Sequence, residues 1–242
     1  MSTNYNILLR SEKQLKRLIA DYLDVVYQMH FKTWKELNEY DQADYGIVFD
    51  NAERRIKRAM LREEELIDEC IWTISKDGPR ANHLRFIISV IYCAKDLTRA
   101  SEYVASIVKI IVRRNIDQQK LDLIEPIIKS YLTVIEKIIK IYKSNAEEKF
   151  EKVDELINQF EQQFDEQERK IREKFKNHTH SGDEIAYLYV SQIVRLINST
   201  IERIKSVFPS TLFIKSSTST TTINTENKKT DASKKSSTTK KA

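Results

Sequence analysis

The chain has 242 residues, of which 40% are hydrophobic and 32% are charged, so it can bury a substantial core in one or two domains. Only three glycines and three prolines occur, which disfavours turn-rich β architectures and predicts an all-α fold. The longest apolar run, residues 86–94, is too short to span a bilayer, and no signal-peptide pattern opens the chain, so we expect a cytoplasmic protein.

The net charge of +5 comes from the C-terminal segment. Residues 209–242 contain seven lysines against Glu226 and Asp231, while the rest of the chain has 34 basic and 34 acidic residues. A neutral body argues against a nucleic-acid-binding surface spread over the fold. The segment itself is rich in Lys, Ser and Thr and has almost nothing to bury, which predicts disorder. Its lysine pairs could contact anionic lipid or, without specificity, nucleic acid.

Apolar positions that recur at three and four residues predict six helices, over residues 11–40, 46–75, 80–114, 120–142, 145–176 and 183–207. The Gly78-Pro79 pair separates the second helix from the third, and a polar break at 115–119 separates the first three helices from the rest. Pro126 is expected to be tolerated near the start of the fourth helix or to mark its true first turn. The pattern predicts two tandem three-helix bundles, residues 8–115 and 116–208, followed by a disordered tail, 209–242.

Three stretches of the first half carry a family resemblance. They are Ile67-Asp-Glu-Cys-Ile71, then Pro79-x-Ala-x-x-Leu-Arg-Phe-Ile87, then Asp96-Leu-x-Arg-x-x-Glu-Tyr103. In order and spacing they resemble the core of the PhoU family, the regulators of phosphate uptake. A weaker match in the second half is Asp154-x-x-Ile157-Asn158. The resemblance implies a tandem of two three-helix bundles and a homodimer.

PhoU proteins carry two acidic residues four apart in the third helix of each repeat, and the resemblance implies multinuclear iron or zinc sites there. This chain has Thr98 and Glu102 at those positions in the first repeat, and Arg195 and Ser199 in the second. One carboxylate of four remains. Glu102 and Asp68 are the metal candidates for a single divalent or iron-type ion, and the alternative is a solvated helix face.

The resemblance also includes Arg85, Arg99, Asp96 and Pro79. We expect the arginines to form ion pairs inside the bundle, with direct phosphate binding as the alternative. Pro79 sets the turn. Cys70 and Cys93 lie on apolar helix sides and are expected to be buried thiols. His178 and His180 form a weak metal motif with Asp183 as the nearest further ligand.

The sequence contains no glycine-rich phosphate loop, nucleophile elbow or zinc-protease helix motif. This favours a binding protein over an enzyme. The resemblance implies negative regulation of phosphate transport through contact with the ATPase subunit of a phosphate ABC transporter, with a phosphate-sensing histidine kinase as a second partner. Three alternatives stay open: a metal-binding or metal-storage bundle, a structural adaptor, and a nucleic-acid-associated protein that acts through the tail.

Overall fold

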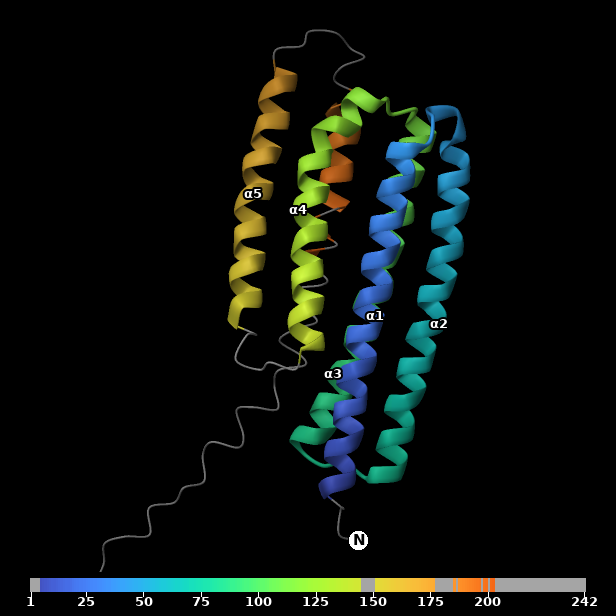
Figure 1. Cartoon of the computed structure of the whole chain (residues 1–242), viewed down its shortest axis with the longest axis vertical. Helices are drawn as coiled ribbons and strands as arrows, with labels where there is room; N and C mark the ends of the chain where they lie inside the picture. Colours follow the sequence, from blue (N-terminus) through green and yellow to red (C-terminus); the bar gives the residue numbers. More distant parts are fainter. Residues whose placement is uncertain are drawn as a thin grey trace, which may run out of the picture.

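The computed structural model describes residues 5–144, 151–176, 185, 187–196, 198–199 and 201–202, and these residues are helices and their connections without any strand. In chain order the elements are α1 (Tyr5–Glu39), η1 (Gln42–Asp44), α2 (Tyr45–Asp77), α3 (Asn82–Arg114), α4 (Gln118–Lys143) and α5 (Glu151–Lys176). Residues 187–196 are also helical. The long helices run along the long axis of the molecule (Figure 1). The all-α prediction is confirmed.

The first three helices form a bundle in which each helix packs against the other two. Their buried faces repeat at helical spacing, as Leu15, Ile19, Leu23 and Val26 show on α1. α3 is the most buried of the three, which explains its nearly continuous apolar stretch. Cys70 and Cys93 are buried thiols, as expected, and burial raises the pKa of Cys70 to about 12.

Helix α2 ends at Gly78, which adopts a left-handed conformation with φ of 54° and ψ of 49° and donates its amide to the Ile74 carbonyl. Pro79 is buried in the turn that follows. Side chains from α1 hold this end of the bundle together. Ser11 donates to Asp77 at 2.6 Å, and the nearly buried Glu12 contacts His83. The turn therefore sets how α2 and α3 align.

Replacing Gly46 or Gly78 by alanine should change the stability of the protein in opposite directions. A Cβ at either position meets nothing within 4 Å, but only Gly78 has a positive φ. Gly78→Ala should therefore lower the free energy of unfolding by about 1 kcal/mol, because alanine is strained in the left-handed region. Gly46→Ala, in the first turn of α2, should raise it by about 0.5 kcal/mol. Urea denaturation of both variants checks the opposite signs; equal signs would contradict the turn geometry.

The second half of the chain is built onto α1. Helix α4 packs against α1 and α5, and its start is capped by Asp117, whose carboxylate accepts from the Lys120 amide at 3.0 Å. Pro126 lies inside α4, which begins at Gln118, so of the two alternatives the proline is tolerated within the helix. Buried residues of all five long helices, together with Val190, Ile193, Val194 and Ile201, belong to one continuous core.

Two further sequence expectations differ from the structure or lie outside it. Helix α1 begins at Tyr5, six residues earlier than predicted, and Leu8 extends its buried face. The predicted disordered tail, 209–242, lies outside the described residues, as do His178, His180 and Asp183. Within the described residues, no helix combines the length and apolarity needed to cross a lipid bilayer.

Candidate functional site

A short chain of hydrogen bonds joins the first three helices at the position where the sequence resemblance places an acidic residue. The Tyr22 hydroxyl of α1 lies 2.6 Å from Thr98 Oγ1 of α3, and Thr98 donates to Glu63 of α2 at 2.5 Å. Tyr22 and Thr98 are buried. Because Thr98 gives its proton to Glu63, Tyr22 is the donor to Thr98. The three groups form a connected, satisfied polar network inside the bundle.

Two negatively charged side chains, Glu63 and Glu102, act on the Tyr22 hydroxyl of this network. Burial raises the pKa of Tyr22 well above its ordinary value, the hydrogen bond with Thr98 opposes this, and the negative charges of Glu63 and Glu102 raise it further. Glu102 therefore lies close enough to be felt by Tyr22, although its own side chain is exposed. The candidate carboxylates beside Thr98 are thus Glu63 and Glu102.

Asp68, the other metal candidate from the sequence, lies elsewhere. The Thr98–Glu63 contact fixes the antiparallel alignment of α2 and α3 and places Asp68 near the level of Cys93. Glu102 is nine residues further along α3, or about 14 Å at the rise of a helix. Among the described residues no group of three or more His, Cys, Asp or Glu side chains is placed to hold a metal ion.

These residues do not fit the multinuclear cluster that the resemblance implies. The buried position is a hydroxyl that already donates to Glu63, and among the described residues two carboxylates lie beside it, too few to hold several iron or zinc ions. In the second repeat, Arg195 is exposed and Ser199 half-buried on helical residues, where neither supplies a carboxylate. A single ion at Glu102 stays a prediction.

The arginines of the resemblance are on the surface. Arg99 is 56% exposed and lies 3.9 Å from Asp96 on the same helix, so this pair does not lie inside the bundle as expected. Arg85 is also exposed on α3. Exposed pairs of this kind contribute little to stability. Pro79 is the member of the set with a clear structural role, in the turn.

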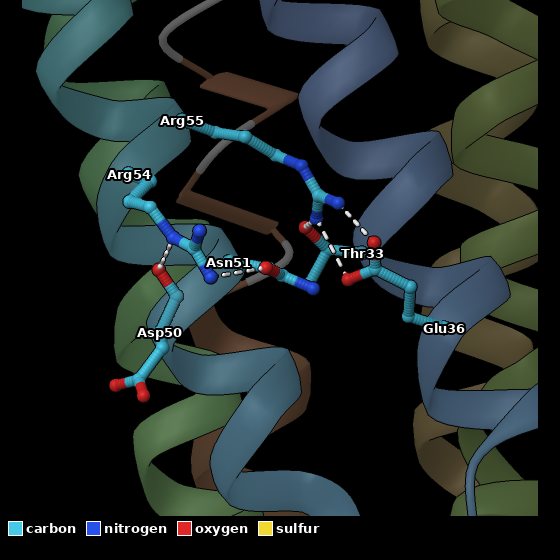
Figure 2. A network of polar contacts seen from close by, with 6 residues as sticks. All are labelled: Thr33, Glu36, Asp50, Asn51, Arg54 and Arg55. Carbon is cyan, nitrogen blue, oxygen red and sulfur yellow. Dashed lines mark hydrogen bonds and ion pairs between the residues drawn. The ribbon is translucent and has the colours of Figure 1, made fainter.

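The arginine that does link two helices is one that sequence reasoning missed. Arg55 of α2 reaches across to α1 and makes a two-pronged contact with Glu36 and a 3.0 Å hydrogen bond to Thr33 (Figure 2). Arg54 stays on its own helix and bonds to Asn51 at 2.8 Å (Figure 2). Arg55 and Glu36 are each only 18% exposed. A paired guanidinium of this geometry fixes orientation as well as distance.

A second missed group lies where α1, α3 and α4 meet. His30 is buried, and its Nε2 donates to the Ala100 carbonyl at 3.1 Å and lies 3.4 Å from the Tyr131 hydroxyl. Burial lowers the pKa of His30 to about 3. Trp34 Nε1 is buried without a hydrogen-bond partner among the described residues. The Trp34 side chain and His30 both line a small cavity with a volume of about 40 Å³. Such a cavity can hold a water molecule.

The outer side of α2 and α3 presents large apolar side chains to solvent. We call Ile71, Trp72, Ile88 and Tyr92 the apolar face; they are 52%, 59%, 40% and 63% exposed. The alignment of the two helices places Ile71 level with position 90 of α3, between Ile88 and Tyr92. Contiguous apolar side chains on a protein surface mark interaction sites.

Comparisons with known proteins agree with this architecture. The family model of the PhoU domain matches residues 19–111, which include the Tyr22–Thr98–Glu63 network and the apolar face. A crystal structure of the phosphate transport system regulatory protein PhoU from Streptococcus pneumoniae superposes with a TM-score of 0.66 at 14% identity, covering 86% of this chain and 97% of that one. At that identity the likeness shows the fold.

Two mycoplasma proteins are similar in sequence. Uncharacterized protein MG409 of Mycoplasma genitalium is 30% identical over 232 residues, which cover 88% of this chain and 96% of that protein. The MG409 homolog of Mycoplasma pneumoniae is 30% identical over 169 residues, covering 67% of this chain and 74% of that protein. With the domain match, the fold and the shared motifs taken together, the chain belongs to the PhoU family.

Proposed function

We propose that this protein is a cytoplasmic negative regulator of phosphate uptake that acts by contact with the ATPase subunit of a phosphate ABC transporter. The observation that carries the proposal is the apolar face, which lies on the PhoU-matched helices and exposes four large side chains. The structurally similar Streptococcus pneumoniae protein is a phosphate transport system regulatory protein, which supports the choice of partner. Regulation then needs only docking and no bond chemistry. A homodimer and a sensor histidine kinase partner are further parts of the proposal.

The test is affinity capture of the tagged protein from cells grown with ample and with scarce phosphate. We expect the transporter ATPase to be recovered, and more of it when phosphate is ample. The double variant Ile71→Ser with Ile88→Ser should recover at least tenfold less of the ATPase, because it removes apolar area from the centre of the contact.

The matched control is Leu9→Ser with Ile47→Ser, which changes two side chains of similar exposure, 41% and 47%, away from the apolar face. It should retain the ATPase. Recovery of no transporter component under either growth condition would overturn the proposed function. An equal loss of ATPase recovery in both double variants would overturn the role of the apolar face.

A further inference from the structure

A strongly basic hollow lies between the first turns of α1 and the end of α4, away from the apolar face. It has a volume of about 540 Å³, and its lining includes five basic side chains and one carboxylate. The basic residues are Arg10, Lys13, Lys16, Arg17 and Lys143, and the carboxylate is Asp21. Lys143 is paired with Asp24 at 2.5 Å, which holds its ammonium group in place.

Several exposed basic side chains elsewhere on the surface are paired with acids four residues away, as in Lys35–Glu39 near the end of α1 and in Lys129–Glu125 and Lys140–Glu136 of α4. Arg10, Lys13 and Arg17 instead follow one another at intervals of three and four, and no carboxylate of the described residues forms an ion pair with them. Like charges at this spacing destabilise a helix, so the cluster costs stability.

We propose that this hollow binds a small anion with several adjacent negative charges, of the class of a di- or triphosphate chain. Both the concave shape and the positive charge of the hollow favour anion binding, because clefts lined by one sign of charge concentrate oppositely charged ligands. The volume is that of a small-molecule site and exceeds what one orthophosphate needs. The combination of arginine forks and lysine point charges is the usual chemistry of phosphate recognition.

Two other polyanions fit less well. Single-stranded nucleic acid is held on stacking platforms of exposed aromatic side chains, whereas the aromatic residue of this lining, Tyr142, is buried. An anionic membrane is a broad surface that contacts protruding basic side chains, and here the basic groups surround a depression. The site is independent of the proposed docking function, because the two use different faces and different chemistry.

Isothermal titration calorimetry of the full chain with sodium tripolyphosphate tests the proposal. We expect one site per chain with a micromolar dissociation constant at 50 mM NaCl, weakened at least fivefold at 300 mM NaCl by screening. The double variant Lys13→Glu with Arg17→Glu should bind at least tenfold more weakly. The control, Lys57→Glu with Lys109→Glu, makes the same charge change at exposed lysines of α2 and α3 and should bind like the wild type.

Three results would overturn the assignment. Equal weakening in both double variants would mean that only net charge matters. Orthophosphate binding as tightly as tripolyphosphate would remove the phosphate-chain class. Binding to vesicles containing phosphatidylglycerol, without binding to tripolyphosphate, would mean that the basic cluster meets a lipid surface. Thermal unfolding of each variant confirms that it is folded, and none of these results bears on capture of the transporter ATPase.

Discussion

Thr98→Asp should lower the free energy of unfolding by about 3 kcal/mol in metal-free buffer, which is roughly 6–12 °C in melting temperature for a chain of this size. The substitution places an acidic residue at the position where the sequence resemblance implies one. In this chain the new carboxylate would lie buried beside Glu63, with Glu102 close by, and would replace a hydroxyl that donates to Glu63. Like charges at this distance, away from water, are strongly unfavourable.

A divalent cation should reverse this loss in the variant and not in the wild type. Three carboxylates and the Tyr22 hydroxyl would then surround one position, and oxygen ligands suit ions such as Mn²⁺. Differential scanning calorimetry with EDTA and with millimolar MnCl₂ makes the comparison. Ser106→Asp, on the outside of the same helix, is the control and should change little in either buffer. Stabilisation of the wild type by Mn²⁺ to the same extent would contradict the loss of the family metal site.

His30 should make the protein lose about 2 kcal/mol of stability between pH 7 and pH 5. Its pKa in the folded state, about 3, is below the ordinary value of 6.5, so the unfolded chain takes up the proton first as the pH falls. The free energy of unfolding is therefore unaffected by His30 above about pH 6.5 and decreases by about 1.4 kcal/mol for each pH unit below it. Among the described residues, no Asp, Glu, Lys or Arg side chain lines the adjoining cavity, and the polar contacts of the ring are the Ala100 carbonyl and the Tyr131 hydroxyl.

Urea denaturation at pH 7, 6 and 5 measures this dependence, with His30→Gln as the comparison. The variant keeps a neutral hydrogen-bond donor and shares every other titrating group with the wild type, so the difference between the two curves isolates His30. We expect the variant to be less stable at pH 7 but to lose less stability on acidification. Parallel curves would show that His30 is not buried in its neutral form.

The fold could be predicted from the sequence because helix periodicity and the Gly78-Pro79 turn are local signals. The registration of α2 and α3 was also within reach, since a turn centred near residue 80 brings position 63 opposite position 98. What local patterns could not show is which polar residues sit inside. His30 and Thr33 occupy the same helical stripe as Leu23, Val26 and Leu37, and that stripe could have marked them as buried.

The arginines show the limit of reasoning from resemblance. Arg85 and Arg99 match the family but are exposed, while Arg55, which no motif singled out, forms an ion pair between α2 and α1. Arg54 and Arg55 are neighbours of the same type, and one residue of helical rotation decides which reaches α1. That rotation depends on how α1 and α2 pack, which is a tertiary property.

The single core shared by both halves has a consequence for how the chain is synthesised. Helices α1, α2 and α3 leave the ribosome first, but α1 also packs against α4, and part of its apolar surface stays uncovered until α4 has been made. At ordinary rates of translation, the 29 residues from Arg114 to Lys143 take about 1.5–6 s to add. During that interval the nascent first half exposes apolar surface that the finished chain buries, and exposed surface of this kind makes a folding intermediate prone to aggregate.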